Sequence, residues 1–263
     1  MTSRRLHPKS AIHPPLCCHH YGQLVQRWRA VARASGARLR RFAFAGSDPI
    51  FFFETPALGA SGGIYISAGI HGDEPASSEA LLAWAEKYKR RLAAWPLLLF
   101  PCLNPWGLRR NIRLDDGGVD LNRAFHLDDH PVIDALRKVV GLREFDLAVM
   151  LHEDYDGEGF YLYEIKRELP FWGEDLLAVA GAHIAIDPRR KIDGRNARAG
   201  LIRRRFDRAR FERLGYPEAI WLHEQHARRA LTVETPSEFA LMQRVNAHVA
   251  VLEECVRRTL AGR

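Results

Sequence analysis

Long apolar runs are absent from this chain of 263 residues. The longest candidates, such as residues 96–101, have the length of a strand, far short of the roughly 18 residues that a membrane-spanning helix needs. Residues 1–20 also lack the continuous apolar core of a secretory signal, and we expect them to form a flexible N-terminal segment. These absences favour a cytoplasmic protein that does not enter a membrane.

Cysteine is scarce, with four residues in the whole chain. Cys17 and Cys18 are neighbours in the sequence, whereas Cys102 and Cys255 have apolar surroundings, so no disulfide framework is visible. The sequence shows neither an internal repeat nor a linker, and its 47% hydrophobic and 27% charged content is typical of a globular protein. We therefore expect a single domain over residues 21–263.

A nucleic-acid-binding motif is also missing, although the net charge is +7. A basic surface attracts acidic ligands in general, so the positive charge fits a substrate with carboxylates and nucleic acid equally well. We therefore expect no nucleic-acid partner, because no such motif accompanies the charge.

Strands and helices alternate along the chain, which predicts an α/β fold with a largely parallel sheet covered on both faces. A turn is expected at residues 104–107, followed by a polar loop up to Asp120. The expected helices cover residues 23–34, a segment that begins just after Glu74, and residues 131–140, 174–182 and 238–260. The expected strands cover residues 41–45, 50–54, 64–68, 97–102, 147–151, 159–163, 219–223 and 231–234.

Residues with metal-binding chemistry follow three of these strands. His71 and Glu74 lie on the turn between strand 64–68 and the next helix, His152 follows strand 147–151, and Glu234 ends strand 231–234. In open α/β sheets, ligands bind beyond the carboxyl ends of the strands, so these side chains can converge. Two imidazoles and a carboxylate suit zinc, and a catalytic zinc keeps a fourth position open for water.

Four motifs together carry a family resemblance. They are His71-Gly72-Asp73-Glu74, Asp120-Leu121-Asn122-Arg123, Leu151-His152 and Thr232-Val233-Glu234-Thr235-Pro236. With them, residues 61–239 resemble the zinc carboxypeptidase family of metallopeptidases, and most closely its small bacterial branch that includes murein tripeptide amidases. The resemblance implies a three-layer α/β/α fold with a mixed, largely parallel central sheet.

The same resemblance implies one zinc ion per chain. His71, Glu74 and His152 would be its ligands, and Asp120 would orient His71 through a hydrogen bond to the imidazole nitrogen that faces away from the metal. The activity implied is hydrolysis of an amide or peptide bond next to a free carboxylate, as in a metallocarboxypeptidase or a murein-peptide amidase. Its substrates would be small peptides or muropeptides.

Four further residues receive roles from the resemblance. Glu234 would be the general base that activates the zinc-bound water, and then the general acid. Arg113 would stabilise the oxyanion, while Asn122 and Arg123 would hold the substrate's terminal carboxylate, which a guanidinium can bind through two parallel hydrogen bonds. The family's substrate-covering tyrosine has no clear counterpart; Tyr216 is the nearest candidate.

Two alternatives remain open at this stage. The aspartoacylase and succinylglutamate desuccinylase group of N-acyl amino acid deacylases shares these motifs, but continues into a β domain after the catalytic glutamate. Here residues 235–263 are expected to form one helix, which favours the peptidase interpretation, although a short deacylase could use the same residues on an acyl-amino acid. The second alternative is a non-catalytic protein that binds peptides or nucleic acid. The sequence sets no oligomeric state.

Overall fold

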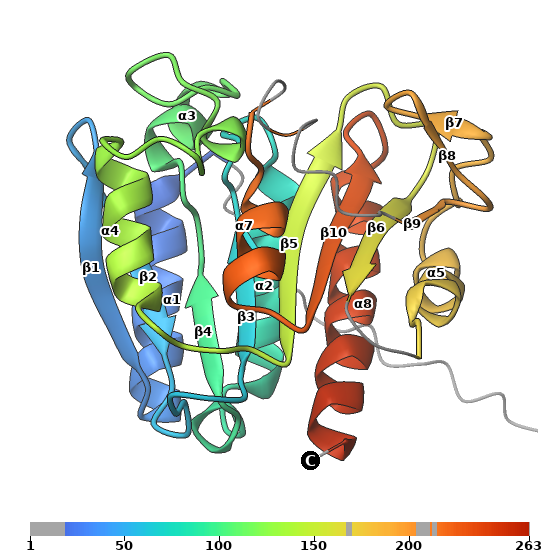
Figure 1. The fold of residues 1–263 in the computed structure, drawn as a ribbon. Coiled ribbons are helices and arrows are strands. Elements are labelled where there is room, and N and C mark those ends of the chain that lie inside the picture. Colours follow the sequence, from blue (N-terminus) through green and yellow to red (C-terminus); the bar gives the residue numbers. More distant parts are fainter. Residues whose placement is uncertain (1–18, 167–169, 204–210, 212–214, 263) are drawn as a thin grey trace, which may run out of the picture.

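The computed structural model describes residues 19–166, 170–203, 211 and 215–262 (Figure 1). An eight-stranded mixed sheet forms the centre, in the order β1-β2-β4-β3-β5-β10-β6-β9. Its strands are β1 (Arg38–Ala45), β2 (Asp48–Glu54), β3 (Ile64–Ala68), β4 (Leu97–Phe100), β5 (Leu147–Asp154), β6 (Tyr161–Lys166), β9 (Leu201–Arg203) and β10 (Arg229–Pro236). Strands β4, β3, β5 and β10 run parallel to one another, whereas β1 and β2 on one side and β6 on the other introduce antiparallel pairs. A separate hairpin joins β7 (Lys191–Ile192) to β8 (Arg195–Asn196).

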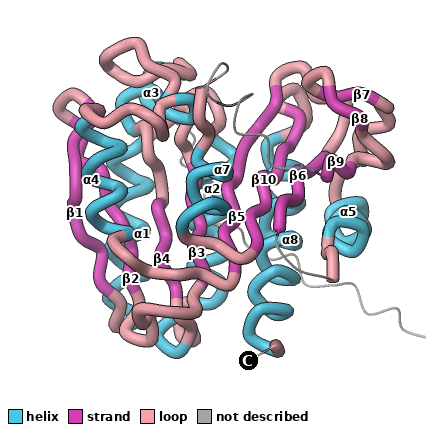
Figure 2. The backbone as a smooth tube through the Cα atoms, in the orientation of Figure 1, coloured by secondary structure: helices cyan, strands magenta, loops and turns pink. Residues whose placement is uncertain are grey.

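Helices cover both faces of this sheet (Figure 2). Alternate residues of β3 show the division: Ile64 and Ile66 pack into one apolar cluster, and Tyr65 packs into another on the opposite face. The first cluster includes side chains of α1 (Tyr21–Ser35), α2 (Pro75–Tyr88), α5 (Gly173–Gly181) and α8 (Leu241–Ala261). The second includes side chains of α4 (Pro131–Val140) and α7 (Glu218–Gln225). A short helix, α3 (Pro105–Arg110), follows β4 in the chain. The expected three-layer fold with a mixed, largely parallel sheet is confirmed.

Two of the expected elements are wrong. The expected turn at residues 104–107 is the beginning of α3, because Pro105 occupies its first position and the Asn104 side chain accepts a hydrogen bond from the Gly107 amide at 2.9 Å. The expected strand at residues 219–223 lies within the helix α7. A short apolar run that is buried on all sides shows no periodicity that separates a strand from a helix.

The remaining elements occur where the sequence predicts them, with shifted ends. Strand β5 extends to Asp154, so His152 lies inside the strand instead of just beyond it. Helix α8 begins at Leu241, three residues later than expected. Residues 1–18 of the expected flexible segment lie outside the described residues. Within the described part of the chain, no helix has the length and apolar character to cross a membrane.

Candidate functional site

The candidate site lies at the carboxyl ends of the parallel strands β3, β5 and β10. Glu234 of β10 is the direct register partner of His152 on β5, so the two residues are neighbours across the sheet. After β3, the chain turns at Gly69, whose φ of 60° suits glycine, and then reaches His71 and Glu74 before α2 begins. The three strand ends therefore converge as the sequence predicts.

Gly72 brings this turn against α3. A Cβ atom added at Gly72 would lie 2.1 Å from the Gly107 carbonyl carbon and 2.4 Å from the Leu108 nitrogen. No side chain fits there without moving the backbone of α3. Glycine at this position thus allows the turn that carries His71 and Glu74 to pack directly on the helix.

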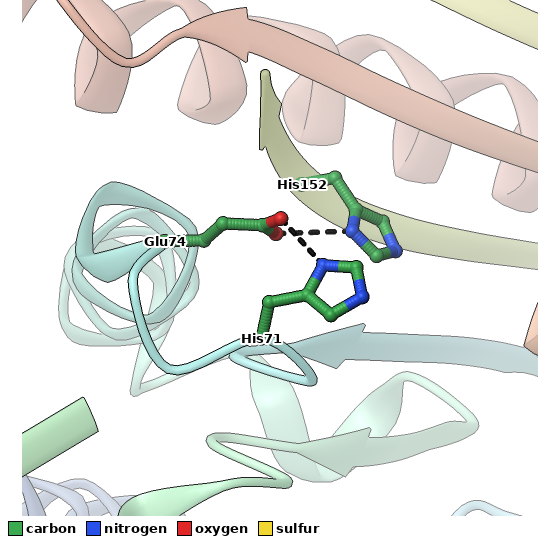
Figure 3. A group of neighbouring side chains, drawn as sticks. All are labelled: His71, Glu74 and His152. Carbon is green, nitrogen blue, oxygen red and sulfur yellow. Dashed lines mark hydrogen bonds and ion pairs between the residues drawn. The ribbon is translucent and has the colours of Figure 1, made fainter. Parts of the chain in front are cut away.

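His71, Glu74 and His152 form a buried cluster in which both imidazoles face one carboxylate (Figure 3). The Nδ1 atom of His71 lies 2.5 Å from Glu74 Oε1, and Nδ1 of His152 lies 3.0 Å from Oε2. One potential ligand atom from each residue lies within 4.8 Å of the other two. Zinc bonds nitrogen and oxygen ligands at about 2.0–2.2 Å, so these atoms can share one ion after small side-chain rotations. The donor set and its geometry therefore fit a metal ion.

Asp120 contacts the His71 imidazole at the nitrogen that faces away from Glu74. Its Oδ1 lies 3.1 Å from His71 Nε2, and its Oδ2 accepts a hydrogen bond from Arg113 Nε at 3.2 Å. Arg113 Nη1 lies 3.6 Å from Glu74 Oε1, so the guanidinium faces the candidate ligands. Asp120 therefore connects the His71 imidazole to the arginine expected to stabilise the oxyanion.

Charges within the cluster shift the pKa values of its members. Burial alone would raise the pKa of Glu74, but the charges and hydrogen bonds of His71 and His152 outweigh it and hold that pKa far below its usual range. Burial would lower the pKa of His71, but the charge of Glu74 and the hydrogen bond with Asp120 raise it instead. Glu74 is therefore ionised, as a metal ligand must be.

Glu234 has the opposite electrostatic environment. Burial raises its pKa to about 8, with a smaller contribution from the charges of Glu74, Asp154 and Asp193, while the charge of His152 opposes the shift. A carboxyl group with a pKa near neutrality can both accept and donate a proton under physiological conditions.

A cavity of about 220 Å³ contains the candidate site. Seven of the eight site residues expected from the sequence line it, namely His71, Glu74, Arg113, Asn122, Arg123, His152 and Glu234. Asp120, the eighth, contacts the cavity wall through His71 and Arg113. The Asn122 side-chain oxygen accepts a hydrogen bond from the Glu218 amide at 3.0 Å, and the Arg123 guanidinium is exposed apart from a bond to the Asn122 carbonyl oxygen.

Three further residues of the cavity wall carry charge or a hydroxyl that the sequence did not assign to the site. Asp154 lies two positions beyond His152, Tyr161 is the β6 partner of Glu234, and Asp193 belongs to the turn of the β7–β8 hairpin. The hydroxyl of Tyr161 donates to Asp154 Oδ2 at 2.9 Å. Strand alternation could have indicated Asp154, since residues two apart face the same side. No local signal could have found Tyr161 or Asp193, because strand pairing brings them here.

Tyr216 does not line this cavity. Its side chain is buried, and its ring packs edge-on against Phe211 with centroids 6.1 Å apart. Among the described residues, Tyr161 is the one tyrosine that reaches the cavity wall.

Comparison with known families finds a match within this chain. Residues 61–165 match the family model described as the succinylglutamate desuccinylase/aspartoacylase catalytic domain. The expected resemblance to this deacylase group is confirmed over that segment, which is less than half of the chain. The matched segment contains the His71, Asp120–Arg123 and His152 motifs and ends before Glu234. No curated protein sequence matches the chain significantly.

Solved structures share the fold over most of this chain. A proposed metallopeptidase from Shewanella baltica OS155 is 23% identical, with a TM-score of 0.79 over 92% of this chain and 93% of that one. A metallo-carboxypeptidase from Burkholderia cenocepacia is 14% identical, with a TM-score of 0.67 over 92% of this chain and 69% of that one. The murein-tripeptide amidase MpaA from Escherichia coli O157 is 16% identical, with a TM-score of 0.58 over 83% of this chain and 91% of that one. At these identities the likeness establishes the fold.

Proposed function

We propose that this protein is a zinc-dependent hydrolase that cleaves an amide or peptide bond next to a free carboxylate. The observation that carries the proposal is the register pair of His152 and Glu234, which sets a carboxyl group with a raised pKa beside the His71–Glu74–His152 cluster in one cavity. A non-catalytic binding protein has no need of that combination.

His71, Glu74 and His152 would hold the metal. Bound zinc would supply a Lewis acid and lower the pKa of a coordinated water from 15.7 toward about 7. The contact between His71 Nε2 and Asp120 Oδ1 keeps the Nε2 proton on that side, which leaves the Nδ1 lone pair directed at the metal position.

Glu234 would move the proton. Its carboxylate takes a proton from the attacking water and returns it to the nitrogen of the leaving amine. Arg113, which is held by Asp120 and faces Glu74, is available to stabilise negative charge on the carbonyl oxygen of the bond under attack.

Asn122 and Arg123 would recognise the free carboxylate of the substrate. The exposed guanidinium of Arg123 donates one hydrogen bond to the Asn122 carbonyl oxygen, and its other N–H groups can donate to a second acceptor. The Asn122 side-chain oxygen accepts from the Glu218 amide, so its NH₂ group would be the part that donates to a ligand.

The fold shared with a metallo-carboxypeptidase and a murein-tripeptide amidase favours a peptide or muropeptide as the substrate. The match of residues 61–165 to the desuccinylase family model favours the alternative, an N-acyl amino acid deacylase.

A substrate panel tests the proposal and separates the two readings. The purified protein would be analysed for bound metal and then assayed, with added zinc, on carboxyl-terminal peptides, murein tripeptide and tetrapeptide, and N-acyl amino acids. We expect zinc-dependent hydrolysis of a peptide or muropeptide, and loss of activity when its terminal carboxylate is amidated. Hydrolysis of N-acyl amino acids alone would support the deacylase, and absence of both zinc and activity would support a binding protein.

A further inference from the structure

Two residues one turn apart on α8 contact the strands that carry His152 and Glu234. Arg244 forms an ion pair with Glu153, which follows His152 on β5. His248 Nε2 lies 3.1 Å from the hydroxyl oxygen of Thr235, which follows Glu234 on β10. Thr235 and Glu153 are themselves register partners. The helix therefore contacts both strands at the pair directly beyond His152 and Glu234.

Glu153 also reaches a third element. Its Oε1 accepts a hydrogen bond of 2.5 Å from the Ala76 amide in the first turn of α2, two residues after Glu74. Its Oε2 accepts from Arg244 of α8. One carboxylate therefore connects the strand that holds His152 to the helix start that holds Glu74.

This connection depends on charge balance. The Glu153 side chain is 0% exposed, and that of Arg244 is 11% exposed. A buried carboxylate without a cation is strongly unfavourable. Among the described residues, the partner that Glu153 would keep after removal of Arg244 is the Ala76 amide at the positive end of α2.

We propose that Arg244, acting through Glu153, is a positioning residue that holds His152 at the distance from Glu74 that metal binding requires. This inference rests on the proposed function, in which His71, Glu74 and His152 hold zinc. Arg244 comes 91 positions after Glu153 and lines no part of the cavity. It therefore acts on the metal site without touching metal or substrate.

The chain contains a matched control. Arg229 and Glu164 form another buried ion pair, with side chains 9% and 0% exposed, at the opposite end of β10 from Glu234. Arg229→Gln and Arg244→Gln therefore each remove a buried ion pair, one far from the candidate ligands and one beside them. A purely structural role for Arg244 predicts the same effect from both.

The test measures the zinc dissociation constant of folded protein by competition with a chromophoric chelator. Circular dichroism verifies the fold of each variant, and the visible spectrum of the cobalt-substituted protein reports the ligand geometry. We expect R244Q to weaken zinc binding by about 10- to 100-fold, as loss of residues that orient metal ligands does, and to alter the cobalt spectrum. R229Q should lower stability without either change.

Equal zinc affinities for R244Q and wild type, or equal weakening in R244Q and R229Q, would overturn the inference. If R244Q does not fold, R244K and R229K replace the glutamine variants, because lysine keeps the charge but loses the planar donor arrangement. R244K should then bind zinc more weakly than R229K, and equal affinities would again refute the role. Failure of the wild-type protein to bind zinc would refute the proposed function itself.

Discussion

Replacing Gly72 with alanine should destabilise the protein and disturb the metal site, although it adds only one methyl group. The new Cβ would lie 2.1 Å from the Gly107 carbonyl carbon, 2.4 Å from its Cα and 2.4 Å from the Leu108 nitrogen. All three atoms belong to backbone, so relief requires the His71–Glu74 turn and α3 to move apart by about 1 Å or more. Overpacking of this kind costs about 1–3 kcal/mol, and the contact here is at the severe end.

For this chain length, 2–3 kcal/mol lowers Tm by roughly 5–10 °C. The same displacement moves His71 and Glu74 relative to His152, so zinc affinity should fall with Tm. Thermal unfolding by circular dichroism and zinc competition by a chromophoric chelator measure the two effects.

The matched control is Gly22→Ala in α1. A Cβ at Gly22 would meet no atom within 4 Å, and alanine favours a helix over glycine by up to about 1 kcal/mol. The same substitution should therefore raise Tm at one position and lower it at the other. A G72A variant with wild-type Tm and zinc affinity would refute the close contact between the turn and α3.

Three further predictions concern individual side chains. Glu234→Gln should retain zinc but reduce kcat by about 10²- to 10⁴-fold, because the amide cannot accept a proton. Steady-state kinetics measures kcat, and a value near that of the wild type would rule out Glu234 as the general base. Arg123→Met should reduce kcat/KM mainly for substrates with a free carboxylate, and an equal loss on amidated substrates would contradict the anchor role. Burial raises the pKa of Glu218, although hydrogen bonds from Tyr65 and Ser67 oppose the shift. Ionisation of Glu218 therefore destabilises the fold as the pH rises above the pKa that Glu218 has in the unfolded chain. Denaturant titrations should therefore show Glu218→Gln gaining stability relative to wild type as the pH rises from about 4.5, and a difference that stays constant with pH would contradict this.

Much of the candidate site could be predicted from the sequence, because its parts follow local rules. The glycine-rich turn after β3, Pro75 at the start of α2 and the apolar strand before His152 each leave a local pattern. The predictions for α3 and α7 were wrong because these helices are short, and tertiary burial determines their conformation more than their own periodicity does.

Residue types and their order along the chain determined the metal-binding chemistry: two imidazoles and a carboxylate, a base, and arginines for an anion. Only the tertiary structure decided which side chains surround them. Tyr161 and Asp193 reach the cavity because β6 pairs with β10 and because the β7–β8 hairpin lies beside them. Arg244 reaches Glu153 because α8 packs behind both strands. These contacts join residues that are far apart in sequence, and they depend on the packing of layers, for which no local pattern exists.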